Sequence, residues 1–169
     1  MTRRFLFLLT SGLALMAADS PVHTIVMVRH GEKLAPAGDT VLNERGQARA
    51  QLLAETLRDA RVSRIFYSPF IRMRQTGKPI SELTGVKPVE ISAGELDKLV
   101  AELRRGEPGA TTLVIHHSNT IPEIVKKLGG GVIAPIPETE YDRLLILTLP
   151  LAANSEGAAH AVTLRYGGK

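Results

Sequence analysis

The 169-residue sequence contains no cysteine and no tryptophan, and only 4% of its residues are aromatic. Without cysteine the chain can form no disulfide, no thiolate nucleophile and no Cys-ligated zinc or iron–sulfur site. This absence is compatible with any redox compartment. Hydrophobic residues make up 44% of the chain and charged residues 22%, which argues against a disordered polymer. The length suits one domain with its own core.

The sequence also lacks an apolar run long enough to span a membrane. Its longest such run, Phe5–Ala18, has fourteen residues and follows Arg3 and Arg4, whereas a spanning helix needs about 20 apolar residues. This pattern predicts a signal peptide or N-terminal membrane anchor over residues 1–18, a domain over residues 19–169, and a periplasmic or secreted location. The alternative is a buried N-terminal helix, although the run is apolar on all sides.

Cleavage of this segment stays open. Ala17 or Ala18 could be the last residue removed, but Leu15 or Met16 would then stand where a small residue is preferred. The protein would touch a membrane only if the segment is uncleaved.

Basic charge is in small excess. The formal net charge is +4, and it falls to +2 without Arg3 and Arg4, because every acidic residue lies at or beyond Asp19. An excess this small does not predict a nucleic-acid-binding surface, so any basic site must be a local cluster.

The hydrophobic pattern beyond residue 20 alternates between strands and helices. Short β-branched or apolar runs predict strands at Thr24–Arg29, Arg64–Ser68, Lys87–Ile91, Thr111–His116, Asp142–Leu149 and Ala161–Tyr166. Amphipathic segments predict helices at Glu44–Ala60, Pro69 to about Leu83, Glu95–Arg105 and Ile121–Leu128. We expect Asn43 to cap the first helix, Pro79 to kink or end the second, and Gly85 to close it. The order predicts an α/β fold with a largely parallel sheet.

Three of the predicted strands end in groups suited to phosphate chemistry. The first ends at Arg29-His30, the second is followed one turn later by Arg72, and the central strand ends at His116-His117. Ligands bind beyond the carboxyl ends of parallel strands, where these groups would meet. Guanidinium groups match phosphoryl oxygens two at a time, a neutral imidazole can attack phosphorus, and nearby positive charge helps to keep that imidazole neutral.

Each of these groups also has an ordinary interpretation. A single histidine at a strand end is more often a satisfied polar residue, and we place His23 and His160 in that class. Two histidines could also bind a metal ion. However, no acidic residue stands at a usual ligand spacing from His117, and the proximity of Glu32 to His30 is weak evidence. The coincidence of all three groups at strand ends favours the phosphate site.

Four segments of the sequence carry a family resemblance. They are RHGE at 29–32, LNERGQA at 42–48, SPFIRMRQT at 68–76 and VIHHSNT at 114–120. In this order they resemble the signature segments of the histidine phosphatase superfamily, which includes phosphoglycerate mutase-like enzymes. The resemblance covers the chain from about Val22 to Leu149. It implies a three-layer α/β/α sandwich of the phosphoglycerate mutase-like type.

The resemblance also implies roles for individual residues. His30 would be the nucleophile that becomes phosphohistidine, Arg29 and Arg72 would hold the phosphoryl oxygens, and His117 would donate a hydrogen bond to the phosphoryl group. His116 stands where the family pattern has a small residue, so we expect it to pack or to line the rim. Further candidate pocket residues are Glu32, Lys33 and Asn119. This chemistry implies no metal and no organic cofactor.

The proton donor to the leaving group is less well specified. Members of this family often use an acidic residue between the second and third segments, and Glu95 and Asp97 fall in that interval. We take Glu95 as the candidate. Alternatively, both acids simply open a helix, where negative charge suits the dipole. The enzyme would then prefer substrates with good leaving groups, such as phosphoramidates or acyl phosphates.

The sequence therefore predicts a phosphohydrolase that acts on a small or envelope-derived phosphoester, with no nucleic-acid partner. Two alternatives stay open: a phosphotransferase of the mutase type, and a non-catalytic module that binds a phosphorylated ligand. A mutase would need more chain for a lid, and pure binding would not need a nucleophile. Substrate identity and oligomeric state are not predicted.

Overall fold

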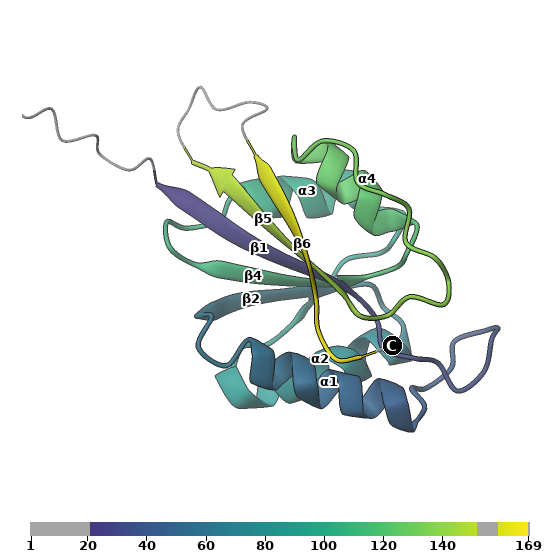
Figure 1. The fold of residues 1–169 in the computed structure, drawn as a ribbon. Helices are drawn as coiled ribbons and strands as arrows, with labels where there is room; N and C mark the ends of the chain where they lie inside the picture. The colour runs from purple at the N-terminus through teal and green to yellow at the C-terminus, as the bar shows by residue number, and fades with distance from the viewer. Residues whose placement is uncertain (1–20, 152–158, 169) are drawn as a thin grey trace, which may run out of the picture.

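The computed structural model describes residues 21–151 and 159–168, and the predicted signal or anchor segment at 1–18 lies outside them. Within these residues ten elements follow one another, and Figure 1 shows their arrangement. The strands are β1 (Val22–Arg29), β2 (Val62–Tyr67), β3 (Val89–Glu90), β4 (Thr111–His116), β5 (Arg143–Pro150) and β6 (His160–Arg165). The helices are α1 (Glu44–Thr56), α2 (Ile71–Thr84), α3 (Leu96–Arg104) and α4 (Thr120–Lys127).

The six strands form one sheet in the order β3-β2-β4-β1-β5-β6. The first four of these are parallel, whereas β5 runs antiparallel to β1 and β6 antiparallel to β5. Helices α1 and α2 cover one face, and α3 and α4 cover the other (Figure 1). The expected three-layer α/β/α sandwich is confirmed, and its sheet is parallel on the side that carries the three functional strand ends.

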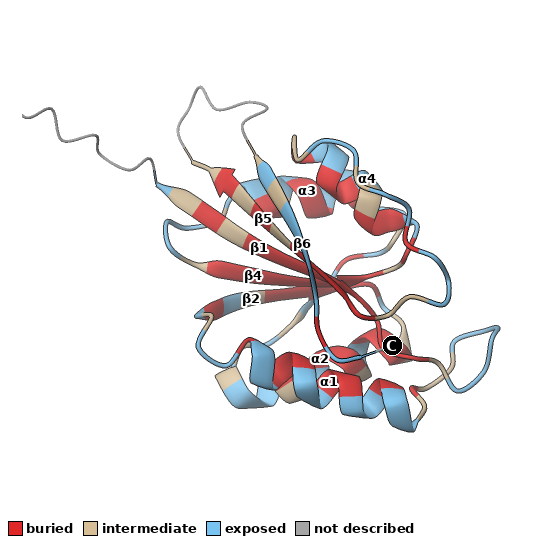
Figure 2. Cartoon of the chain, in the orientation of Figure 1, coloured by how far each residue is buried: buried red, intermediate tan, exposed pale blue. Residues whose placement is uncertain are grey.

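The central strands of the sheet are buried, as Figure 2 shows in red for β1 and β4, whereas β6 at one edge is mostly exposed. Successive side chains of β1 point to opposite faces of the sheet, as in any β-strand. Ile25 and Met27 join the core beneath α3 and α4, whereas Val26 and Val28 join the core beneath α1 and α2. All six residues of β4 are buried, which is why this segment reads as a continuous β-branched run.

Helix boundaries follow local signals, with two differences from expectation. The Asn43 side chain accepts from the Gly46 N–H at 2.9 Å and so caps α1 as predicted, and Gly85 closes α2 with φ 72°. Helix α1 ends at Thr56, before the expected Ala60, because the chain turns there into β2 through Arg61 at φ 53°. Pro79 does not end α2, which continues to Thr84.

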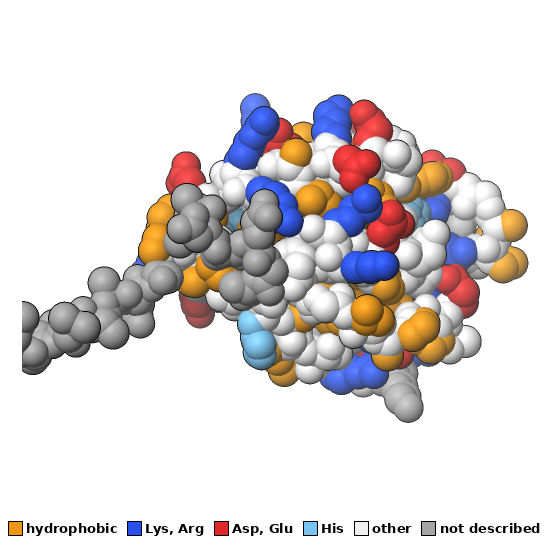
Figure 3. Space-filling view, turned by 90° about the horizontal axis from the view of Figure 1, so that it is seen from above, with side chains coloured by type: hydrophobic (Ala, Val, Ile, Leu, Met, Phe, Trp, Pro, Cys, Tyr) orange, Lys and Arg blue, Asp and Glu red, His pale blue; other side chains and the backbone are white. Residues whose placement is uncertain are grey.

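One edge of the sheet is formed by a very short strand. Strand β3 lies at one edge of the sheet, where a proline such as the preceding Pro88 is tolerated, and it is two residues long, shorter than the expected Lys87–Ile91. Within the described residues, no helix combines the length and apolarity that crossing a membrane requires. Basic and acidic side chains are interspersed on the face seen in Figure 3.

Candidate active site

The carboxyl ends of β1, β2 and β4 meet at one edge of the sheet. In the parallel pairing Arg29 stands opposite His116, and Tyr67 stands opposite Ile115. The His30 N–H then donates to the His116 carbonyl at 3.1 Å, which continues the pairing by one residue. The register therefore brings His30 and His117 to the same edge.

His30 lies at the base of this site with 3% of its surface exposed. Its Nδ1 is 2.7 Å from the Gly31 carbonyl oxygen. A carbonyl can only accept, so Nδ1 carries the proton and Nε2 keeps its lone pair. Burial and, after it, the charges of Arg29 and Arg72 together lower the pKa of His30 to about 4. At neutral pH the imidazole is therefore an uncharged group with one nitrogen available for attack.

The loop after His30 is held by close backbone packing. The Gly31 N–H donates to the Thr76 hydroxyl at 3.0 Å. A Cβ on Gly31 would come within 2.8 Å of the Gly46 carbonyl oxygen, and a Cβ on Gly46 would collide with the backbone of Glu32. Both positions require glycine because the loop and the start of α1 approach backbone to backbone.

His117 is the second histidine at the edge. Its ring centre lies 5.9 Å from that of His30, and its Nε2 is 3.0 Å from the Ser68 hydroxyl. Burial, and after it the charge of Arg72, lowers the pKa of His117 to about 4. His116, by contrast, is fully buried and its Nδ1 contacts the Thr120 hydroxyl at 2.6 Å, which fits the packing role expected for it.

The two buried arginines beside the histidines are held in different ways. Nη1 of Arg29 donates to the carbonyls of Pro137 and Glu140 at 3.0 and 3.2 Å, and Nη2 donates to Glu138 at 2.5 Å. Arg72 instead lies over the Phe70 ring at 4.4 Å. Its Nε and Nη1 are buried and make no hydrogen bond within the described part of the chain. The Asp39 carboxylate lies 3.5 Å from Nη1 without a hydrogen bond, so these donors can still serve a phosphoryl group.

The three further pocket residues predicted from the sequence do not contact the two histidines in the structure. The Glu32 carboxylate is buried against Arg49, with N–O distances of 2.7 to 3.1 Å. Lys33 donates to the Pro36 carbonyl at 2.7 Å. Asn119 is exposed and precedes α4 without a side-chain capping bond. The structure thus places Glu32 in an ion pair rather than against the two histidines.

The two candidate proton donors lie at the start of α3. The Glu95 carboxylate accepts from the Ser92 N–H and from the Lys98 ammonium, both at 3.3 Å. Asp97 pairs with Lys127 at 2.8 Å, and 91% of its side chain is exposed. Neither acid contacts a histidine or arginine of the site in the structure.

Segment 137–141 packs on Arg29; the sequence places the loop Gly129–Tyr141 at the pocket but carries no motif that assigns a role to any of its residues. Besides the contacts already described, the Tyr141 ring lies 4.2 Å from the Arg29 guanidinium and 6.0 Å from the His30 ring. The segment precedes β5, which pairs antiparallel with β1, so it must lie beside the carboxyl end of β1. A polar run directly before a strand of that kind is the signal that could have placed it against Arg29.

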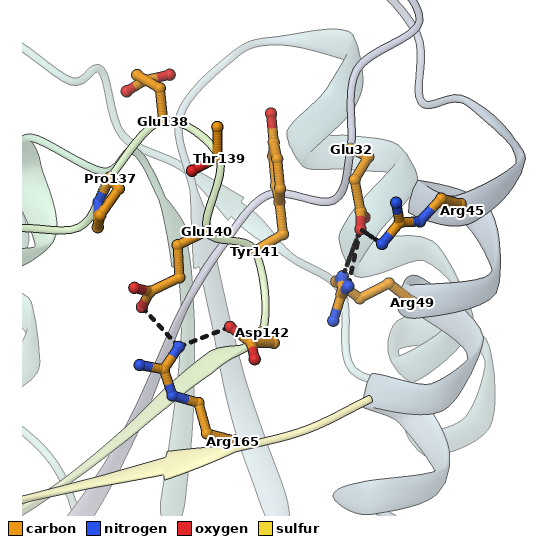
Figure 4. Close-up of a pocket in the computed structure, with 10 residues that line it drawn as sticks. All are labelled: Glu32, Arg45, Arg49, Pro137, Glu138, Thr139, Glu140, Tyr141, Asp142 and Arg165. Carbon is orange, nitrogen blue, oxygen red and sulfur yellow. Dashed lines mark hydrogen bonds and ion pairs between the residues drawn. The ribbon is translucent and has the colours of Figure 1, made fainter. Parts of the chain in front are cut away.

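A pocket of about 670 Å³ lies next to this segment. Figure 4 shows Tyr141 standing between Glu138 on one side and Glu32 with its arginine partners on the other. At the bottom of Figure 4, the Arg165 guanidinium forms ion pairs with Glu140 at 2.9 Å and with Asp142 at 2.7 Å. Across residues 21–151 and 159–168, no group of three or more His, Asp or Glu side chains is arranged to hold a metal ion.

Comparison with known proteins agrees with this geometry. The model of the histidine phosphatase superfamily (branch 1) matches residues 25–97, which include Arg29, His30 and Arg72. No curated protein sequence matches significantly.

Solved structures show the same fold. "Mycobacterial hydrolase 2" is 16% identical with a TM-score of 0.68, covering 88% of this chain and 94% of its own. Mycobacterial glucosyl-3-phosphoglycerate phosphatase is 16% identical with a TM-score of 0.61, covering 75% and 90%. Phosphoglycerate mutase from Plasmodium falciparum is 18% identical with a TM-score of 0.58, covering 87% and 91%. The chain thus matches the model of the histidine phosphatase superfamily over residues 25–97, and it shares its fold with solved phosphatases and with a phosphoglycerate mutase.

Proposed function

We propose that this protein is a phosphohydrolase that transfers the phosphoryl group of a small phosphomonoester to His30 and then to water. One observation carries the proposal: a buried, neutral His30 keeps its Nε2 lone pair beside two arginines and a second histidine. The solved phosphatase among the structural relatives is consistent with it.

The chemistry follows from the positions of these groups. Nε2 of His30 attacks phosphorus, and the P–O bond to the leaving group breaks. Arg29 and Arg72 bind the oxygens on which negative charge is spread in the transition state. His117 donates a hydrogen bond to the same group. Water then attacks the phosphohistidine, and the P–N bond breaks to return the electron pair to Nε2.

Substitution of the nucleophile tests this proposal. We expect His30→Ala to abolish both turnover and covalent labelling by a ³²P-phosphorylated substrate, because no other group in the site replaces Nε2. His160→Ala, on the exposed strand β6, is the matched control and should keep both. Undiminished label on His30→Ala would overturn the assignment. The wild-type activity should also persist in EDTA.

The same assay separates hydrolysis from the alternatives. A mutase-type phosphotransferase would pass the label to an acceptor sugar phosphate rather than to water. A binding module would bind inorganic phosphate with no turnover over a panel of esters. Orthophosphate as the labelled product, with or without an acceptor, supports the hydrolase.

We also propose that residues 1–18 direct the protein out of the cytoplasm, which favours a small or envelope-derived substrate over a cytosolic phosphoprotein. The basic start and short apolar run support this. Fractionation of cells that express the full chain and a chain beginning at Asp19 tests it. Equal distribution of the two proteins would contradict the proposal.

A further inference from the structure

Hydrolysis of an unactivated phosphoester requires a proton for the leaving oxygen. At the start of α3, the Glu95 carboxylate pairs with Lys98 and the Asp97 carboxylate pairs with Lys127. Neither carboxylate contacts Arg29, His30, Arg72 or His117 in the structure. Among the described residues, two carboxylates do reach the arginines of the site. Glu138 pairs with Arg29, and Asp39 lies 3.5 Å from Arg72.

Glu138 is the better placed of these two. One carboxylate oxygen lies 2.5 Å from Nη2 of Arg29, and the other accepts a hydrogen bond from the Ser118 hydroxyl. Ser118 directly follows His117, and the negative charge of Glu138 acts to raise the pKa of His117. The Glu138 carboxylate therefore bridges the ends of β1 and β4. Asp39 instead accepts from the Ile71 N–H at 2.9 Å, outside this bridge.

The direction of attack selects the same residue. His30 is 3% exposed and lies at the base, whereas 73% of the Glu138 side chain is exposed to solvent. In an in-line displacement the leaving oxygen departs on the side opposite the nucleophile. A nucleophile at the base sends the leaving group toward solvent, which is the side on which Glu138 stands.

We propose that Glu138 is the catalytic residue that protonates the leaving oxygen, and this inference rests on the proposed phosphohydrolase function. As the P–N bond to His30 forms and the P–O bond breaks, the electron pair goes to the ester oxygen, which takes the proton of the Glu138 carboxyl. In the second step the Glu138 carboxylate takes a proton from the attacking water. Glu138 thereby returns to its starting state.

The charges around Glu138 explain how it can hold a proton when it is needed. The Ser118 hydrogen bond and the positive charges of Arg29 and Lys33 hold the pKa of the Glu138 carboxyl below its usual range. A phosphoryl dianion bound to Arg29 offsets that positive charge and adds negative charge beside Glu138. A like charge at this distance disfavours the carboxylate and raises its pKa, so substrate binding itself promotes protonation.

The leaving group provides the test. We compare kcat for 4-nitrophenyl phosphate, whose leaving group needs little protonation, with kcat for glycerol 2-phosphate, whose alkoxide must be protonated. Glu138→Gln keeps the shape but has no transferable proton. We expect kcat for glycerol 2-phosphate to fall about 10²- to 10³-fold and kcat for 4-nitrophenyl phosphate to change less than about 5-fold. Glu55→Gln, at an exposed ion pair of α1, is the matched control and should change neither.

Several outcomes would overturn the assignment of Glu138. They are an equal loss on both substrates, no loss on either, or a gain on both with a lower KM, which would mean that Glu138 merely competes with phosphate for Arg29. A selective loss in Glu95→Gln instead of Glu138→Gln would do the same. In each case the wild-type protein still forms phosphohistidine at His30. If it forms none and hydrolyses neither ester, the proposed function itself fails.

Discussion

At the scale of single residues, the two arginines beside His30 differ in how their donors are used. Segment 137–141 surrounds Arg29 with carbonyls, a carboxylate and a ring. Arg72 has a buried Nε and Nη1 with no hydrogen bond to any described residue. An anion that binds Arg72 therefore gains hydrogen bonds without displacing any.

This difference predicts the effect of Arg72→Gln. Because hydrogen bonds to a charged group contribute about 1.5–3 kcal/mol, we expect orthophosphate to bind about 10- to 100-fold more weakly. The free energy of unfolding should change little, since the lost atoms make no hydrogen bond and their ion pair, at 3.5 Å, is with the half-exposed carboxylate of Asp39. Competitive inhibition by phosphate and urea denaturation measure the two effects. A stable variant with unchanged phosphate inhibition would contradict the role of Arg72.

Glu32 should behave in the opposite way. Its carboxylate is paired with Arg49, which also donates to the carbonyls of Tyr166 and Gly168 at 3.0 and 3.2 Å. Removing one charge of a buried pair leaves the other uncompensated, which costs about 3 kcal/mol.

We therefore expect Glu32→Gln to lower the free energy of unfolding by about that amount, with phosphate inhibition nearly unchanged in the folded protein. The same two assays apply as for Arg72→Gln. Weaker phosphate inhibition at unchanged stability would instead restore Glu32 to the phosphate site.

At the scale of elements, the position of His30 depends on the contact between the loop after β1 and the start of α1. No side chain separates the two backbones at Gly31 and Gly46. The cap from Asn43 and the hydrogen bond from Asn43 N–H to the Glu32 carbonyl at 2.9 Å hold the same junction. The motif glycines are thus required by packing rather than by a positive φ.

Gly46→Ala tests this junction. The added methyl would collide with the backbone of Glu32, so we expect a loss of about 1–3 kcal/mol in stability and a lower kcat, because the displaced loop carries His30. Gly94→Ala is the control, since its Cβ would have no neighbour nearer than 3.9 Å. Equal stability and kcat in the two variants would show that the junction can relax.

At the scale of the whole molecule, folding wholly or partly buries four imidazoles in the uncharged state: His23, whose pKa burial lowers, and His30, His116 and His117. Burial lowers the pKa of His30, His116 and His117 to about 4. In the unfolded chain each would take up a proton near pH 6.5. Between pH 6.5 and 4 the unfolded state therefore binds more protons than the native state, so stability falls as the pH is lowered through this window.

His116→Asn isolates one of these contributions. The Asn side chain can keep the contact of Nδ1 with the Thr120 hydroxyl but does not titrate. We expect the slope of unfolding free energy against pH to fall by the contribution of one proton, about 1.4 kcal/mol per pH unit, between pH 6.5 and 4, whatever the change in absolute stability. Urea denaturation at several pH values measures it, and a slope equal to that of the wild-type protein would contradict the buried neutral state of His116.

Local sequence signals predicted most of the fold. The predictions of the Asn43 cap, of the helix end at Gly85 and of the buried strand β4 are confirmed. They depend on interactions between residues close together in the sequence. The end of α1 was misplaced because residues 57–60 favour a helix by composition, whereas the turn at Arg61 is set by the need to enter β2. Pro79 was expected to kink or end α2; the helix does not end there but continues to Thr84.

The sequence by itself determined the strand ends at which Arg29, His30, Arg72 and His117 meet, because parallel register follows from the order of strands and helices. Only the tertiary structure decided where the acidic residues go. Glu32 turns to Arg49, and Glu138 reaches Arg29 from a segment 109 residues further along the chain. Carboxylates pair with whichever cation the folded chain brings near them. That proximity depends on the packing of β5 against β1, which no local pattern encodes.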